Sequence, residues 1–133
     1  MNVQITELIN KYLDTIAVCV SKLEKEYGRN DLLTAYREKE IPKEASINGV
    51  NFEFHGVGCY FEHQEIECDM DFGPRNRTDG FDAWRLSKFA KQFKEFNCYA
   101  DENTVQNELT ALEMLGKIKK FNEPPKENLY YLV

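Results

Sequence analysis

The chain has 133 residues, with 17 Lys and Arg against 23 Asp and Glu, so its formal net charge is −6 and its pI is near 5.0. This length is typical of one domain, and 42% hydrophobic with 13% aromatic residues supplies a core and excludes a disordered chain. The acidic balance argues against a nucleic-acid partner, because phosphate neutralisation needs surplus Lys and Arg. We therefore predict a single domain over residues 1–133.

The sequence also predicts where the protein resides. Its longest apolar run, residues 16–20, is far shorter than a membrane span, and the N-terminus lacks the pattern of an export signal. The four cysteines form no C-x-x-C pair in a chain large enough to fold without disulfides. We expect a cytoplasmic protein with free thiols and no membrane partner.

The N-terminal part reads as helical. Apolar residues at spacings of three and four predict a long amphipathic helix over residues 3–27. Gly28 follows in the position typical of a left-handed cap. Asn30 and Asp31 are then expected to cap a short helix that runs to about Glu38.

Alternating polar and apolar residues between 47 and 72 predict a small antiparallel meander of two or three strands. The alternation changes parity at Gly56, which predicts a β-bulge or a tight bend within residues 56–58. Residues 63–65 are expected to form a hairpin turn.

A polar loop over residues 73–80 leads into a second helical region. The aromatic residues of 81–96, including Trp84, predict a helix with an aromatic face, capped by Thr78, Asp79 or Asp82.

The C-terminal segment predicts one more helix and a hairpin. The helix is expected to start at Asp101, to turn Leu115 inward and to stop at Gly116, before a hairpin over residues 118–133. The predicted fold class is α+β: a long N-terminal helix and further helices packed on a small antiparallel sheet, with a C-terminal helix-helix-hairpin order that resembles a winged helix.

Charge is concentrated in one segment. Residues 44–74 contain seven acids and no Lys or Arg, which leaves a net charge of +1 on the rest of the chain. Glu67, Asp69 and Asp71 share one strand face and form an acidic row, which Glu62 and Glu65 extend at the turn. Such a row either attracts a cationic partner or is only the solvated outer face of the sheet.

The same carboxylates suggest an alternative, a metal-dependent hydrolase that uses Asp69 and Asp71. Nuclease sites of this design usually add a nearby Lys, which residues 44–74 lack. Since no catalytic or phosphate-binding motif stands out either, we expect a non-enzymatic protein with no metal and no cofactor.

The loop before the second helical region has two interpretations. Arg75 and Arg77 stand opposite Asp79 and Asp82, which predicts an ion-pair and capping network that fixes the turn, anchored by Trp84. The alternative is a recognition surface, because Arg and Trp dominate interface energies.

Two motifs, H-G-x-G-C at residues 55–59 and D-x-D-F-G-P-x-x-R-x-D-G-F-D-x-W-R-L at residues 69–86, resemble those of a bacterial domain family of unknown function. The resemblance covers about residues 50–133 and transfers no catalytic residues. It implies a context: small acidic bacterial domains of this kind are similar to immunity proteins, which bind and neutralise a toxin.

The sequence thus predicts an immunity protein that blocks a basic toxin, such as a nuclease, through its acidic surface. A winged-helix transcriptional or adaptor protein is the alternative. The residues expected to bind the partner are Glu62, Glu65, Glu67, Asp69, Asp71, Tyr60, Arg75, Arg77 and Trp84.

Overall fold

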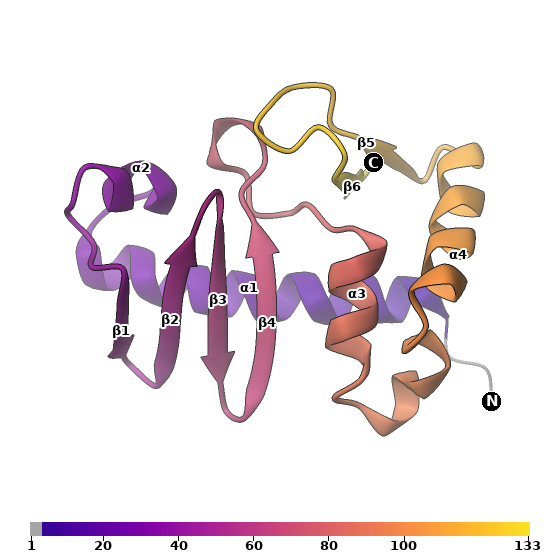
Figure 1. The fold of residues 1–133 in the computed structure, drawn as a ribbon, viewed down its shortest axis with the longest axis horizontal. Coiled ribbons are helices and arrows are strands. Elements are labelled where there is room, and N and C mark those ends of the chain that lie inside the picture. Colours follow the sequence, from indigo (N-terminus) through magenta and orange to yellow (C-terminus); the bar gives the residue numbers. More distant parts are fainter. Residues whose placement is uncertain (1–3) are drawn as a thin grey trace.

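The structure, a computed structural model, describes residues 4–133 (Figure 1). An antiparallel sheet and a group of helices stand side by side, and the long helix α1 runs behind both. In chain order the elements are α1 (Ile5–Tyr27), α2 (Leu32–Arg37), β1 (Glu44–Ile47), β2 (Val50–His55), β3 (Gly58–His63), β4 (Ile66–Asp71), α3 (Ala83–Ala90), α4 (Glu102–Met114), β5 (Ile118–Lys120) and β6 (Tyr130–Leu132). The α+β fold class is confirmed.

Helix α1 follows its prediction closely. It begins at Ile5, while residue 3, where the predicted helix started, lies outside the described residues. It ends at Tyr27, and Gly28, with a φ of +65°, is the left-handed cap expected there. Asp31 precedes α2 as predicted, but its carboxylate pairs with Arg29 at 3.3 Å and does not cap the helix.

Strands β1 to β4 form a meander in sequence order, each antiparallel to the next. The parity change at Gly56 is a tight hairpin turn and not a bulge: Gly56 has φ +56°, and His55 stands opposite Gly58. Across a two-residue turn, an even-numbered residue of one strand stands opposite an odd-numbered residue of the next. The buried positions therefore change parity at the turn. The predicted turn at residues 63–65 is confirmed, with Gln64 and Glu65 at positive φ.

The sheet has four strands, where two or three were predicted. Strand β1 was missed because its burial alternates weakly over only four residues. A stronger local signal was present: Asn48 and Gly49, with φ of +50° and +80°, form the two-residue turn that joins β1 to β2.

Helix α1 packs against one face of the sheet and supplies much of the core. The Tyr12 hydroxyl donates to the Asp69 carbonyl oxygen at 2.5 Å, which ties α1 to β4. The largest fully buried side chains include Tyr12, Phe54, Phe61, Phe72, Phe81 and Phe89. This face of the sheet is therefore closed.

Helix α3 is shorter than predicted. Asp82 is its N-cap and accepts the Arg85 amide at 2.8 Å, but the helix ends at Ala90, and residues 94–99 form a separate 3₁₀ helix. The prediction of a single aromatic face is also wrong, because Trp84 is 46% exposed whereas Phe89 is buried. Five helical positions rotate a side chain by about 500°, so these two residues point to different sides.

Helix α4 starts after Asp101, whose carboxylate accepts the Thr104 amide at 2.9 Å, as expected for a cap. Leu115 was predicted to turn inward and is 69% exposed, because the helix ends at Met114 and Gly116 takes a positive φ. The terminal hairpin β5–β6 is confirmed, and its likeness to a winged helix stays a prediction. Among residues 4–133, no helix combines the length and the apolar character needed to cross a membrane.

The outer sheet face as the candidate functional site

The face of the sheet opposite α1, here called the outer face, carries the acidic segment. No described element lies over it in Figure 1. Strand alternation places these side chains on it: Glu44, Ser46, Asn51, Glu53, His55, Tyr60, Glu62, Glu67, Asp69 and Asp71. The predicted acidic row of β4 therefore lies on this face, with Glu67 exposed and Asp71 buried.

Two pairs of glutamates stand directly opposite one another on this face. Glu44 is the cross-strand partner of Glu53, and Glu62 is the partner of Glu67. Both pairs occupy non-hydrogen-bonded positions of the ladder, where opposed side chains are closest. Within the described chain, no Lys, Arg or His lies within ion-pair distance of these four carboxylates. Like charges so placed destabilise a sheet.

Neutral donors relieve only one of the two pairs. The Asn51 side-chain amide donates to Glu62 at 2.7 Å, and the Tyr60 hydroxyl donates to Glu67. Burial raises the pKa of Tyr60 above its usual value, and the hydrogen bond and negative charge of Glu67 raise it further. Tyr60 therefore keeps its proton as a donor at the centre of the face.

The other end of the acidic row is neutralised. Asp69 pairs with Lys88 of α3, and His55 Nε2 lies 3.4 Å from its second oxygen. Asp71 is 5% exposed and accepts Arg85 at 2.6 Å and Lys126 at 3.1 Å. Cationic groups from α3 and the C-terminal segment thus occupy both aspartates.

This arrangement bears on the metal-dependent alternative. One carboxylate oxygen of Asp69 already contacts the Lys88 ammonium, and one oxygen of Asp71 contacts both a guanidinium and an ammonium group. Residues 4–133 also hold no group of three or more His, Cys, Asp or Glu side chains arranged to bind a metal ion.

Residues of both sequence motifs lie around the ion pairs of Arg85. Its guanidinium contacts Asp71 and also Asp82, the N-cap of its own helix. Gly58, in the first motif, leaves room for the Asp71 side chain, since a Cβ there would overlap the Asp71 carboxylate and lie 2.6 Å from the Met70 carbonyl oxygen. The motif residues thus join β3, β4 and α3 into one ion-paired unit.

The loop network is partly as predicted. Arg77 pairs with Asp79 and lies over the Phe121 and Tyr131 rings. Arg75, however, reaches Glu123 at 3.2 Å, and Asp82 pairs with Arg85 instead of a loop arginine.

Trp84 does not lie inside this network. It is half exposed, with Arg85 and Lys88 against its ring at 5.1 and 4.9 Å from the centroid. It adjoins the outer face through Lys88, which pairs with Asp69.

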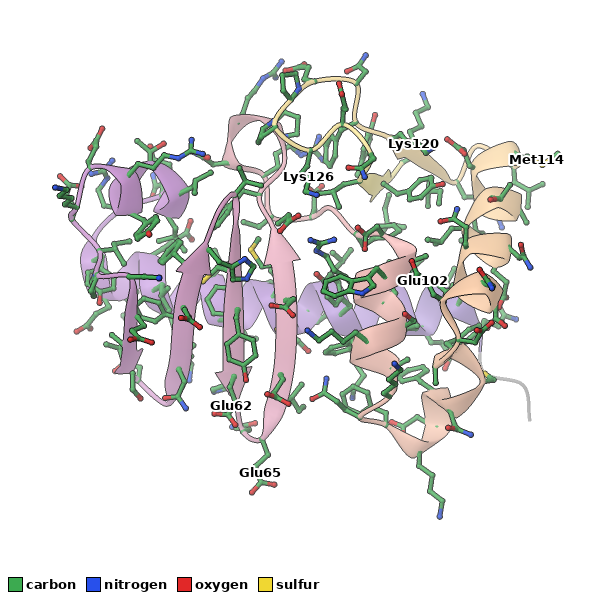
Figure 2. All side chains as sticks on the ribbon, viewed as in Figure 1. Glu62, Glu65, Glu102, Met114, Lys120 and Lys126 are labelled. Carbon is green, nitrogen blue, oxygen red and sulfur yellow. The ribbon has the colours of Figure 1, made fainter. Side chains whose placement is uncertain are left out.

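The structure therefore gathers some of the predicted site residues and separates others. Tyr60, Glu62, Glu67, Asp69 and Asp71 share the outer face, and Figure 2 places Glu65 at the tip of the β3–β4 hairpin, beyond Glu62. Arg75 and Arg77 contact the C-terminal segment instead. The sequence analysis did not single out Glu44, Glu53, Arg85, Lys88 or Lys126. The register that the Asn48–Gly49 turn sets pairs Glu44 with Glu53. Arg85 lies within the second motif, but no local signal marks Lys88 or Lys126.

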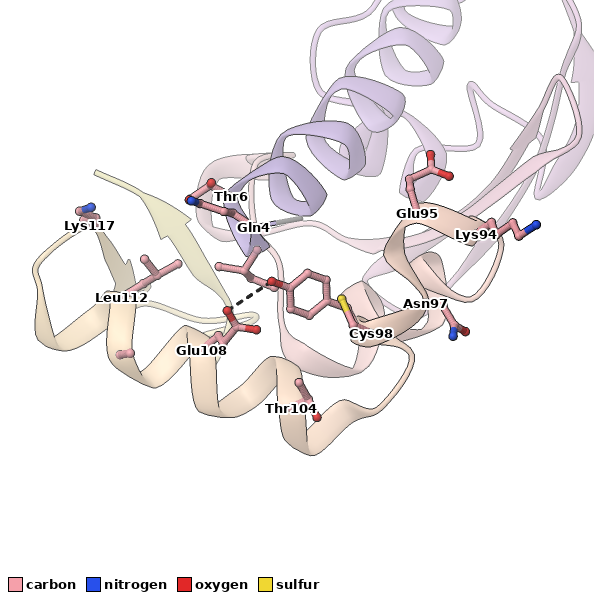
Figure 3. Close-up of a pocket in the computed structure, with 13 residues that line it drawn as sticks. Gln4, Thr6, Lys94, Glu95, Asn97, Cys98, Thr104, Glu108, Leu112 and Lys117 are labelled. Carbon is pink, nitrogen blue, oxygen red and sulfur yellow. Dashed lines mark hydrogen bonds between the residues drawn. The ribbon is translucent and has the colours of Figure 1, made fainter. Parts of the chain in front are cut away.

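A large cavity lies elsewhere, between the N-terminal end of α1, the 3₁₀ helix and α4 (Figure 3). It is open, has a volume of about 690 Å³ and is lined by none of the predicted site residues. Inside it Tyr99 donates to Glu108 at 3.3 Å, and burial followed by the Glu108 charge raises the pKa of Tyr99 to about 12.

The chain matches the model of a known protein family over most of its length. The model described as "Domain of unknown function (DUF6896)" matches residues 5–132, nearly the whole chain. No curated protein and no solved structure matches it.

Proposed function

The chain belongs to the DUF6896 family of domains of unknown function, and from its outer face we propose that it is a non-enzymatic immunity protein that binds and neutralises a basic toxin. The cytoplasm is the expected compartment, where the buried Cys19, Cys59 and Cys68 remain free thiols.

The observation that carries this proposal is the presence of two pairs of opposed glutamates, Glu44 with Glu53 and Glu62 with Glu67. A sheet selected for stability alone would place opposite charges at such positions. Neutral donors relieve the second pair only in part, and no described Lys, Arg or His pairs with any of the four carboxylates. Sites that break a stabilising rule without full compensation are commonly functional. A cationic partner on this face would remove the repulsion and would be steered toward it over long range.

The contacts divide the predicted site residues by role. Glu62 and Glu67 supply free negative charge together with Glu65 at the hairpin tip, whereas Asp69 and Asp71 are already paired. Tyr60 and the half-exposed Trp84 offer aromatic anchors beside them. Arg75 and Arg77 would reach only a partner that extends past the sheet.

The test starts from the neighbouring reading frame, because an immunity protein is expected beside its toxin. Its product should co-purify with this chain, and the complex should associate more slowly as salt is added. A triple variant, Glu53→Lys with Glu62→Lys and Glu67→Lys, should slow association by about tenfold or more at low salt.

The matched control reverses three carboxylates that lie off the outer face, in Asp14→Lys with Glu95→Lys and Glu113→Lys. This control has the same net charge as the test variant. Equal slowing by both variants would mean that net charge, and not the outer face, governs binding.

The winged-helix alternative gains no support from the helix that would read DNA. Helix α4 contains no Lys or Arg between Glu102 and Met114, whereas phosphate and base contacts need them. We therefore offer no second function.

A further inference from the structure

Strand β1 is a free edge of the sheet. Because the Asn48–Gly49 turn makes Ile47 and Val50 a hydrogen-bonded pair, the alternation turns the backbone groups of Glu44 and Ser46 away from β2. The bond from the Phe54 amide to the Lys43 carbonyl, at 2.8 Å, fixes the same phase. In residues 4–133 no element lies beyond β1 (Figure 1).

The opposite edge of the sheet is closed. Gln92, which follows α3, accepts the Glu67 amide at 2.7 Å and donates to the Glu67 carbonyl oxygen at 2.6 Å. Its side-chain amide thus takes the place of a neighbouring strand on β4. On β4 the Gln92 side chain covers the edge, whereas on β1 no described residue pairs with the N–H and C=O groups of Glu44 and Ser46. Such groups readily pair with another strand.

The side chains of β1 specify what such a strand should look like. On the outer face Glu44 repels Glu53, and no described cation lies within ion-pair distance of it. On the inner side Ala45 and Ile47 are half-buried and extend the core up to the edge. A strand added beside β1 would meet a carboxylate on one face and apolar groups on the other.

We propose that β1 docks an extended segment of the basic partner, in which cationic and apolar residues alternate, as a fifth strand of the sheet. This inference rests on the proposed function and identifies where that partner makes its backbone contacts. Main-chain hydrogen bonds to Glu44 and Ser46 hold the segment, and its cations neutralise the Glu44–Glu53 pair. A second copy of this chain fits less well, since each copy has a net charge of −6 and would bring its own Glu44 to the junction.

The direct test uses a synthetic peptide of about seven residues in which lysine and valine alternate, long enough to span β1. Amide hydrogen exchange, followed by NMR, should slow by about tenfold at Glu44 and Ser46 when the peptide is in excess. A peptide of the same composition with its lysines and valines in two blocks should protect neither amide. Unchanged exchange at both positions with millimolar alternating peptide would overturn the proposal.

Two further variants test the backbone contact itself. Ser46→Pro removes an N–H that β2 does not use and should abolish peptide protection, whereas Ser46→Thr keeps the N–H and should preserve it. If Ser46→Pro unfolds, the alternating peptide N-methylated at alternate residues removes the same hydrogen bonds without changing the protein. Protection that survives N-methylation in both registers would contradict strand addition.

The failures of the two proposals are distinguishable with the toxin complex. If Glu44→Lys and Glu62→Lys slow association equally and Ser46→Pro has no effect, the face binds without the edge: the strand inference fails and the proposed function stands. If the neighbouring gene product does not bind at all, the proposed function fails, and the peptide experiment still decides whether β1 accepts a basic strand.

Discussion

Two groups of carboxylates on the outer face are in opposite circumstances. Asp69 and Asp71 are paired with Lys88, Arg85 and Lys126, whereas the opposed glutamates have no described cation within ion-pair distance. Strands β1 to β4 contain no Lys or Arg, so the Lys and Arg groups that neutralise these aspartates come from α3 or the C-terminal segment. Carboxylates near those elements form ion pairs that join parts of the fold, and the others have no described cationic partner.

Burial explains why the pairing falls where it does. Asp71 is 5% exposed, and a buried carboxylate without a partner is costly. The side chains of Glu44, Glu53 and Glu67 are exposed, so water screens their repulsion and the cost per pair is below about 1 kcal/mol. The fold therefore tolerates uncompensated charge only at its surface.

The largest effect should come from Arg85→Met. It leaves Asp71 with Lys126 alone and removes the contact to Asp82, so we expect a loss of about 3 kcal/mol in the free energy of unfolding. Urea unfolding measures it. Lys88→Met, which breaks a more exposed pair, should cost at most about 1 kcal/mol. Equal losses would erase the distinction between a structural and a surface pair.

Gly58→Ala should follow. The added methyl group overlaps the Asp71 carboxylate and the Met70 carbonyl, which predicts a loss of about 2–3 kcal/mol. Gly116→Ala is the control, since no atom lies within 4 Å of its Cβ and only its φ of +73° is unfavourable, at about 1 kcal/mol. A Gly58→Ala loss no larger than the control's would mean that Asp71 moves freely.

Tyr60 adjoins both groups of carboxylates, since it stands opposite Asp69 and its hydroxyl donates to Glu67. Burial and Glu67 raise its pKa, so the folded protein keeps a proton that an unfolded tyrosine loses near pH 10. This stabilisation is complete below about pH 10 and is lost as the pH rises further. The phenolate absorbance of the parent minus that of Tyr60→Phe gives the titration. Glu67→Gln should lower the pKa of Tyr60, and an unmoved titration would remove Glu67 as a cause.

The smallest effect has the opposite sign. Glu53→Gln and Glu62→Gln should each stabilise the fold by about 0.2–1 kcal/mol, because each removes one opposed like charge. The gain, measured by thermal unfolding, should shrink in high salt. Glu95→Gln serves as a neutral reference. Destabilisation by the two sheet variants would show that the glutamates are compensated in solution.

Local patterns were sufficient for much of the fold. The caps at Gly28, Asp82 and Asp101 and the change of parity at Gly56 depend on neighbouring residues, and the structure confirms each position. The long aromatic helix failed because burial of Phe96 depends on tertiary packing, which a 3₁₀ turn satisfies as well as an α-helix.

The charge pattern of the sequence predicted the acidic face, but it did not predict which of its carboxylates are paired with cations. Asp71 and Lys126 are distant in sequence, and so are Asp69 and Lys88, so no spacing rule connects them. Likewise, the opposed Glu62 and Glu67 become visible only when the strand register is known. Pairings between elements decide which carboxylates are free, and such pairings leave no local signature in the chain.

Trp84 is the chain's one tryptophan, and it is 46% exposed beside Lys88. An indole that water already reaches changes its surroundings little when the protein unfolds, so its fluorescence should be a poor monitor of stability. A partner seated on the outer face would cover the same ring and exclude that water. Intrinsic emission should therefore shift to shorter wavelength on binding, which provides an optical signal for occupancy of the face without any added label.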